Sequence, residues 1–162
     1  HTACRRQRQM CIRDRGYSVR PLEMSGAIGS VQLKKWPKLL QGRMDNVKYF
    51  KELFEDVPWL RMQEEKHGDS TWFSFGCVLQ GALAGRRNEV IKAFEEGGIE
   101  ARPLASGNFL NQPVTKMMPH YNHENYEGAQ DIDENGFWVG NHSTDCKAGI
   151  FKMFTILKGL AE

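Results

Sequence analysis

Residues 16–33 read Gly-Tyr-Ser-Val-Arg-Pro-Leu-Glu-Met-Ser-Gly-Ala-Ile-Gly-Ser-Val-Gln-Leu, and this stretch is the most informative part of the sequence. Its first six residues are typical of a loop, and Pro21 suits the first turn of a helix that we expect over about residues 22–35. Gly26 and Gly29 each weaken that helix by about 1 kcal/mol relative to alanine. Close packing against another backbone is the usual compensation, so we expect an interface helix.

Pro37 is expected to interrupt this helix, and a second helix is predicted to run to about Asp56. Apolar residues spaced three and four apart mark one of its faces: Leu40, Met44, Val47, Phe50 and Phe54. Charged residues fill the opposite side: Lys48, Lys51, Glu52 and Glu55. Pro58 ends the pattern, which is typical of a long amphipathic helix joining two parts of a larger protein.

Downstream, the periodicity switches between strand and helix. Strands are expected over residues 60–65, 71–80, 99–104 and 137–139, and helices from Asn88 to Gly97, over 124–135 and over 145–160. In the strand 71–80, Phe73 shares a face with Phe75, and both faces carry bulky apolar groups, so both should be largely covered. The order predicts a small α+β layer.

Residues 1–15 differ from the rest because they contain five arginines and one aspartate. The run Met10-Cys-Ile-Arg-Asp-Arg15 resembles the translation of a sequencing adaptor. We therefore expect residues 1–15 to be a non-native leader. The remainder is expected to divide into the end of a large domain with its linking helix (16–57) and a small C-terminal domain (58–162).

The composition is that of an ordinary globular protein, with 40% hydrophobic residues, 26% charged residues and a net charge of +2. No apolar run approaches the ~20 residues of a membrane span. Cys77 and Cys146 are far apart and form no CxxC pair, so two reduced thiols and a cytoplasmic protein are expected.

The spacing of polar and charged residues, taken alone, indicates few candidate catalytic or metal-binding residues. His120 and His123 lie in a long polar stretch with two residues between them, but no third ligand has a suitable position, so surface histidines are favoured over a metal site. His142 follows a strand, where active-site residues are common, yet a lone loop histidine is more often structural. The pattern includes no phosphate-binding glycine fingerprint, nucleophile elbow or carboxylate pair.

Four segments carry a resemblance to a known family, which the spacing of single residues does not show. The stretch at residues 16–33, Gly98-Ile-Glu-Ala-Arg-Pro-Leu104 and the pair Gly107-Asn-Phe-Leu-Asn-Gln-Pro113 and Asn135-Gly-Phe-Trp-Val-Gly-Asn-His142 are collinear with the sugar aminotransferase family (DegT/DnrJ/EryC1/StrS). The last two resemble its 3-dehydratase branch. The resemblance implies the small C-terminal domain of a fold type I pyridoxal-phosphate (PLP) enzyme, an α/β protein with a mainly antiparallel small sheet.

The resemblance also implies roles for individual residues. The loop ending at Arg20 would reach the neighbouring subunit of a homodimer, where Ser18, at a position usually held by asparagine, could donate to the cofactor phosphate. Arg20 could bind a phosphate or carboxylate. Arg102 would contact the nucleotide-linked 4-keto-6-deoxy sugar or glutamate, and Asn108 and Phe109 would fold over the substrate. Each residue could instead serve only packing, a turn or a surface ion pair.

For the full-length protein, the resemblance implies that PLP or pyridoxamine phosphate (PMP) serves as an electron sink and that glutamate is the amino donor. It also implies that the sugar loses its C3 hydroxyl, which is a reaction of deoxysugar formation in lipopolysaccharide biosynthesis. The catalytic histidine would lie upstream, so no catalytic residue, metal or nucleic-acid partner is expected here, and this part alone should be inactive. Two alternatives stay open: a nucleotide-sugar aminotransferase of the perosamine-forming kind, with lysine in place of that histidine, and a non-enzymatic α+β binding module. The module predicts that helix 22–35 packs on its own core, whereas the partial-enzyme hypothesis predicts that it is poorly covered.

Overall fold

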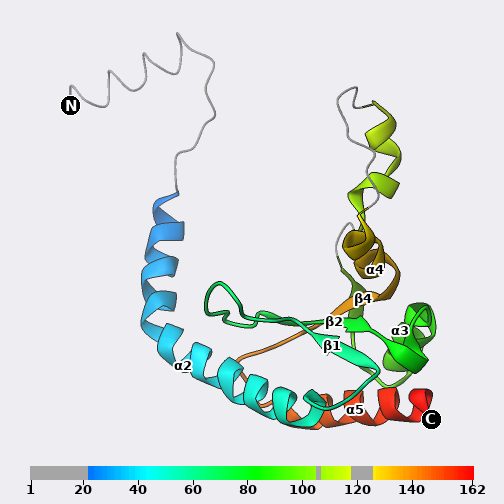
Figure 1. The fold of residues 1–162 in the computed structure, drawn as a ribbon. Coiled ribbons are helices and arrows are strands. Elements are labelled where there is room, and N and C mark those ends of the chain that lie inside the picture. Colours follow the sequence, from blue (N-terminus) through cyan, green and yellow to red (C-terminus); the bar gives the residue numbers. More distant parts are fainter. Residues whose placement is uncertain (1–21, 105–106, 118–125) are drawn as a thin grey trace. The chain divides into compact units, whose positions relative to one another are not determined.

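A computed structural model describes residues 22–104, 107–117 and 126–162. Its elements are α2 (Glu23–Phe54), β1 (Leu60–Met62), β2 (Ser74–Leu79), η1 (Gly81–Leu83), α3 (Arg87–Glu96), β3 (Ala101–Pro103), η2 (Phe109–Asn111), η3 (Pro113–Met117), α4 (Glu127–Asn135), β4 (Gly136–Gly140) and α5 (Lys147–Ala161) (Figure 1). The chain divides into two compact units at Trp36 and Pro37. None of the described helices is both long and apolar enough to cross a bilayer.

The sheet has the strand order β1-β2-β4-β3, and every neighbouring pair is antiparallel. Phe75 lies opposite Val139 on β4, and Arg102 on β3 lies opposite Trp138. The expected α/β class with a small antiparallel sheet is therefore confirmed. The order of elements from residue 58 onward is also the one that the hydrophobic periodicity predicts.

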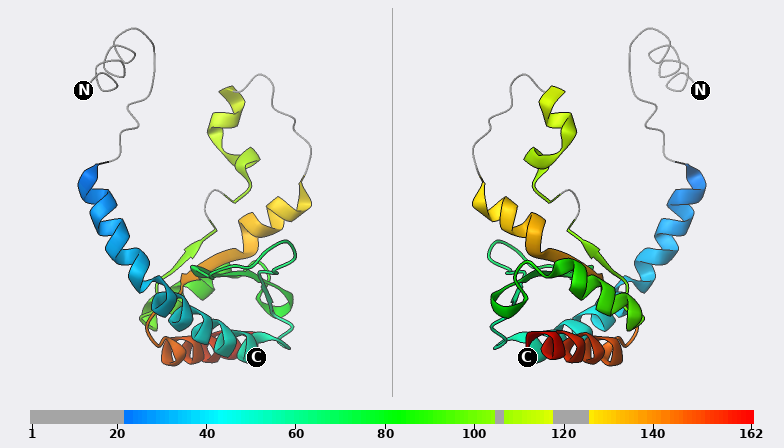
Figure 2. Two further views of the ribbon diagram at one scale, coloured as in Figure 1. Left: turned by 90° about the vertical axis from the view of Figure 1, so that its left-hand side faces the viewer. Right: turned by 90° about the vertical axis from the view of Figure 1, so that its right-hand side faces the viewer.

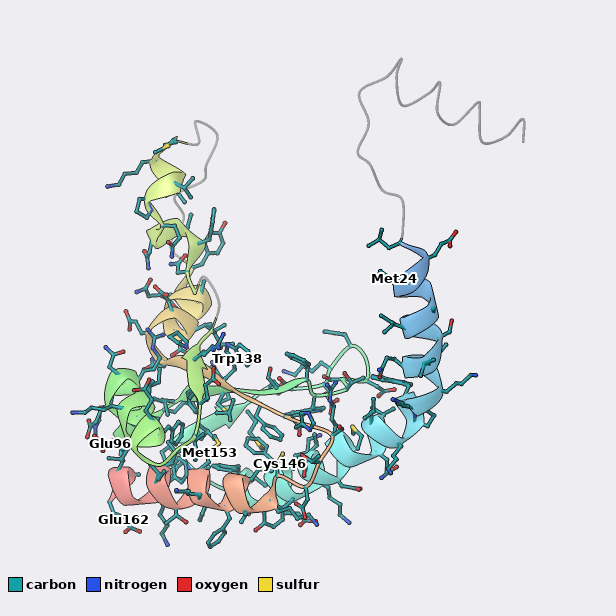
Figure 3. The ribbon with its side chains drawn as sticks, turned by 180° about the vertical axis from the view of Figure 1, so that it is seen from behind. Met24, Glu96, Trp138, Cys146, Met153 and Glu162 are labelled. Atoms are coloured by element: carbon teal, nitrogen blue, oxygen red, sulfur yellow. The ribbon has the colours of Figure 1, made fainter. Side chains whose placement is uncertain are left out.

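A single core covers one face of the sheet. It joins three helices through Val47, Phe50 and Phe54 of α2, Val90 and Phe94 of α3, and Ile150, Met153 and Leu157 of α5. From the sheet, Phe75, Cys77 and Leu79 face these helices, because alternate residues of a strand share a face. The helix α4 lies on the other side of the sheet (Figures 1 and 2), and Figure 3 shows Met153 on α5 and Trp138 on β4.

Aromatic pairs tie α2 to this core. The centre of the Phe50 ring lies 4.2 Å from that of Phe75 in a stacked pair, and the centre of the Phe54 ring lies 5.4 Å from that of Phe154 on α5 in an edge-to-face pair. Such pairs contribute about 0.5–1.5 kcal/mol each beyond their buried area. Lys48, Lys51, Glu52 and Glu55 are exposed on the opposite face, so the predicted amphipathic character of this part of α2 is confirmed.

The prediction that Pro37 separates two helices is wrong, because α2 runs through Pro37. Proline removes one backbone donor and crowds the carbonyl four residues earlier, that of Leu33. Residues 31–38 are exposed, so water can reach that carbonyl. The loss of one helical hydrogen bond is therefore tolerated without a break in the helix.

The expected start of α3 at an Asn88 cap is also wrong, because the helix begins at Arg87 with Arg86 at the N-cap. The Arg86 guanidinium donates to both carboxylate oxygens of Glu89, each at 2.8 Å, and fixes the first turn. The other end is as predicted. Gly98 has a φ of 72°, and Ile99 N donates to Phe94 O at 2.8 Å, which together form the left-handed cap.

The predicted strand 71–80 begins later, at Ser74, and its alternation fails at its start. Phe73 is 65% exposed although it should share a face with buried Phe75, whereas Trp72 is 1% exposed. Trp72 has a φ of 45°, in the left-handed region. This turn of the backbone reverses the side chains before the strand begins, and it brings Phe73 to the surface.

Candidate functional site

Of the residues expected to bind the cofactor and substrate, Ser18 and Arg20 lie outside the described residues, and so do His120 and His123. Arg102 lies on β3 with its side chain 65% exposed. Its guanidinium donates to Glu100 Oε1 from Nε at 3.0 Å. Arg102 is therefore available to solvent, with Glu100 as its present partner.

Asn108 and Phe109 have different surroundings although they are neighbours. Asn108 is buried, its Nδ2 donates to Gln130 Oε1 at 3.1 Å, and its Oδ1 accepts from Leu110 N at 3.1 Å. It thereby caps η2 and ties this turn to α4. Phe109 is 40% exposed at the start of η2. In this structure, the Asn108 side chain is engaged in holding the turn, and Phe109 is the member of the pair that reaches the surface.

His142 is exposed, and its Nδ1 lies 3.1 Å from Thr144 Oγ1. Within the described ranges, no group of three or more His, Cys, Asp or Glu side chains could hold a metal ion. Cys77 and Cys146 are free, and burial raises the pKa of the Cys77 thiol. Cys77 is therefore a packed core residue.

Two buried asparagines join α2 to the loop between β4 and α5. Asn46 Nδ2 donates to Asn141 Oδ1 at 3.1 Å and to the carbonyls of His142 and Thr144 at 3.0 and 2.8 Å, while Asn46 Oδ1 accepts from Cys146 N at 3.0 Å. Asn141 Nδ2 donates to the carbonyls of Arg43 and Trp72. We call Asn46 and Asn141 the asparagine pair. Its hydrogen bonds satisfy backbone groups that burial would otherwise leave without partners.

Glu65 fixes the loop between β1 and β2. Its carboxylate accepts from Lys51 Nζ at 2.9 Å, Ser70 N at 2.9 Å and Trp72 Nε1 at 2.8 Å. These three donors, the Lys51 ammonium first, hold the pKa of Glu65 to about 2. Because Trp72 is the residue with the left-handed backbone, Glu65 also helps to keep that conformation.

Half-buried Arg43 and exposed Phe73 form a pair that the sequence pattern did not single out. The Arg43 guanidinium carbon lies 5.3 Å from the centre of the Phe73 ring. The two residues are 30 positions apart in the sequence, and strand alternation places Phe73 on the covered face. The sequence therefore offers no signal for this pair.

A PLP site would require polar groups whose hydrogen-bonding capacity is free for the cofactor. The five buried polar side chains are Asn46, Asn108, Thr115, Asn135 and Asn141, and each already bonds to protein groups. Two buried nitrogens in the described part of the chain have no partner, Arg43 Nε and Arg87 Nε, and the Arg87 guanidinium is otherwise engaged by the carbonyls of Asp133 and Gly136. The described residues thus do not form a PLP cradle.

Solved structures with 39–40% sequence identity share this fold. The E. coli GDP-4-keto-6-deoxy-D-mannose-3-dehydratase with bound hydrated PLP superimposes with a TM-score of 0.78 at 40% identity, over 88% of this chain and 36% of that chain. A GDP-4-keto-6-deoxymannose-3-dehydratase with a trapped PLP-glutamate geminal diamine gives a TM-score of 0.78 at 39% identity, over 88% of this chain and 37% of that one.

Curated relatives agree with the solved structures. The chain is 44% identical over 144 residues to the GDP-4-keto-6-deoxy-D-mannose 3-dehydratase of Yersinia pseudotuberculosis, and 41% identical over 144 residues to that of Escherichia coli O55:H7. Each match covers 88% of this chain but only 36% or 37% of the relative. The chain thus spans little more than a third of the curated relatives it matches.

The family profile gives the broadest match, over residues 1–152. That range includes residues 1–15, so the non-native character expected of this leader stays a prediction. Since the match extends over most of the sequence, the chain belongs to the DegT/DnrJ/EryC1/StrS aminotransferase family.

Proposed function

We propose that this chain is the C-terminal part of a GDP-4-keto-6-deoxymannose 3-dehydratase that uses PLP and PMP. The enzyme would act in the cytoplasm on deoxysugars for lipopolysaccharide, with a nucleotide-linked 4-keto-6-deoxy sugar and glutamate as substrates. The observation that carries the proposal is the 44% and 41% identity to two such dehydratases over 144 residues. When it is bound, PLP supplies the electron sink for the reaction. The described residues do not form the PLP site, so no catalytic step is assigned to them.

In the proposed enzyme, residues 16–57 close the large domain and link it to the small domain at 58–162, and two subunits form a homodimer. Exposed apolar side chains on α2 and at the residue before it are consistent with a larger protein: Leu22, Met24, Ile28, Val31, Leu33 and Trp36 are 39–73% exposed. Such side chains are typical of a surface that a partner or a further domain covers.

Within this proposal, Ser18 and Arg20 contact the cofactor phosphate, and Arg102 contacts the substrate. Phe109 contributes the exposed apolar surface of the η2 turn, and Asn108 holds that turn in place. Arg102 is the strongest candidate of these because its guanidinium is exposed, and a carboxylate or phosphate could replace Glu100 as its partner.

The decisive experiment is to sequence the gene upstream of codon 16 and assay the longer protein with GDP-4-keto-6-deoxymannose, glutamate and PLP. We expect histidine where the family's aminotransferases carry the Schiff-base lysine, and a 3-deoxy product. Lysine at that position together with an amino-sugar product would establish the aminotransferase alternative instead. A longer protein with neither activity would refute both enzyme assignments.

A further inference from the structure

The pair formed by half-buried Arg43 and exposed Phe73, which we call the Arg43–Phe73 platform, has unused hydrogen-bonding capacity. Among the described residues, the Arg43 side chain has no hydrogen bond or ion pair, and its Nε is buried without an acceptor. A nearby carboxylate, Asp45, instead accepts from Gln41 at 2.8 Å. The other guanidinium nitrogens of Arg43 therefore keep their hydrogen-bonding capacity for an acceptor from outside these residues.

The geometry of the Arg43 guanidinium limits the chemical class of the acceptor that it can bind. Its donors form a rigid planar fork that matches the oxygens of a phosphate or carboxylate. Phe73, 65% exposed, provides an apolar surface against the guanidinium. Exclusion of water from one side of a cation strengthens its attraction for an anion. The platform therefore suits an oxyanion better than a neutral ligand.

The backbone beneath the platform is fixed rather than loose. Asn141 Nδ2 donates to the Arg43 carbonyl at 3.2 Å and to the Trp72 carbonyl at 2.9 Å, and Asn141 N donates to the Phe73 carbonyl at 3.0 Å. One buried residue thus holds the main chain under both members of the platform. Binding would then require little ordering of the protein, which favours affinity.

The conformation of Trp72 is the second unusual feature at this place. A φ of 45° is a genuine outlier for a bulky side chain. Backbone strain of this kind persists only where surrounding contacts enforce it, and it clusters at ligand sites. Here its consequence is direct, because it is the turn at Trp72 that exposes Phe73 beside Arg43.

We propose that the Arg43–Phe73 platform binds a phosphate oxyanion of the nucleotide-linked substrate, with Arg43 as the donor. The substrate class rests on the proposed function, whereas the site rests on the side chains described above. A carboxylate such as that of glutamate shares the same chemistry, so the experiment must separate the two anions.

The test is a titration of the ¹⁵N-labelled chain with sodium pyrophosphate, in which the arginine Nε–H resonances are followed by NMR. Arg43→Gln assigns the Arg43 signal. We expect a saturable shift of that signal, and an affinity for pyrophosphate, measured by isothermal titration calorimetry for every variant, at least tenfold weaker in Arg43→Gln. Arg43→Lys, which keeps the charge but loses the fork, should also bind more weakly. The matched control is Arg61→Gln, since Arg61 is an exposed arginine already paired with Asp131 at 2.9 Å. It should stay within twofold of the unmodified chain.

Several outcomes would overturn the proposal: no saturable shift at Arg43, unchanged affinity in Arg43→Gln or Arg43→Lys, or an equal loss in Arg61→Gln. Saturation by sodium glutamate but not by pyrophosphate would replace the phosphate with a carboxylate and reject the assignment made here. Thermal unfolding followed by circular dichroism checks that each variant is folded. The titration does not depend on catalysis, so a longer protein without dehydratase activity would refute only the proposed function.

Discussion

Buried polar residues decide how the segments that flank the sheet are held. The asparagine pair links α2, the backbone before β2 and the loop that precedes α5, although these segments are far apart in sequence. Glu65 does the same at the surface, where it gathers donors from α2 and from its own loop. In both places one side chain satisfies several partners, so its loss affects more than one segment.

Replacement of Asn46 by alanine should destabilise the chain by about 3 kcal/mol, because it removes a partner from the buried Asn141 Oδ1, from the carbonyls of His142 and Thr144 and from the Cys146 amide. Urea unfolding followed by circular dichroism measures the change. Gln41→Ala is the control, since that amide is exposed and bonds only to Asp45, and it should change stability by less than about 0.5 kcal/mol. Equal effects of the two substitutions would contradict the role given to Asn46.

The lowered pKa of Glu65 implies that the stability of the folded chain depends on pH. Its pKa is about 2 in the folded chain, below the ordinary value of 4.5, so the folded state binds fewer protons in this window. The stability that Glu65 contributes is therefore fully present above about pH 4.5 and is lost as the pH falls through about 2. The difference in unfolding free energy between the unmodified chain and Glu65→Gln should shrink over this window. A difference that stays constant from pH 5 to pH 2 would contradict a stabilising role of the ionised Glu65 carboxylate.

The helix α2 shows how one element can combine two environments. From Asn46 onward it contributes to the core, whereas residues 22–38 are exposed throughout. Its glycines differ in the same way. A Cβ at Gly42 would overlap the carbonyl oxygen of Ser143, while one at Gly29 would meet nothing within 4 Å. The first glycine therefore permits a close contact within this chain, and the second has no such role here.

This contrast gives a matched pair of substitutions. Gly42→Ala should destabilise the chain by about 1–3 kcal/mol, because the backbone at Ser143 must move. Gly29→Ala should instead favour the helix by about 1 kcal/mol. Urea unfolding and the helical signal at 222 nm distinguish the two. If Gly29→Ala lowered both helicity and stability, a contact of that glycine within this chain would have to exist.

At the scale of the whole molecule, the described part of the chain has a complete small-domain core but no set of groups for PLP. The five buried polar side chains are engaged, and the apolar face of α2 before Trp36 is exposed. Both features fit a chain that spans little more than a third of its curated relatives.

The isolated chain is therefore expected to bind neither PLP nor PMP stoichiometrically and to have no dehydratase activity. Purification in the presence of PMP, followed by desalting and absorbance spectroscopy, measures bound cofactor. The longer protein under the same conditions is the positive control and should retain it. Stoichiometric absorbance with the isolated chain would show that it holds a cofactor site that the described residues do not reveal.

The sequence by itself determined the family, the order of elements after residue 58, the amphipathic half of α2 and the left-handed cap at Gly98. These features depend on local periodicity and on motifs that are contiguous in the chain. Three features are visible only in the tertiary structure. The helix α2 continues through Pro37, the backbone turn at Trp72 exposes Phe73, and Asn46 is hydrogen-bonded to Asn141. The helix continues through Pro37 because residues 31–38 are exposed to water. The other two features depend on partners distant in sequence, 69 residues for Trp72 and Asn141 and 95 residues for the asparagine pair. The motif at residues 16–33 thus indicates the protein's relatives, while the contacts around Arg43 and Phe73 depend on how distant segments pack.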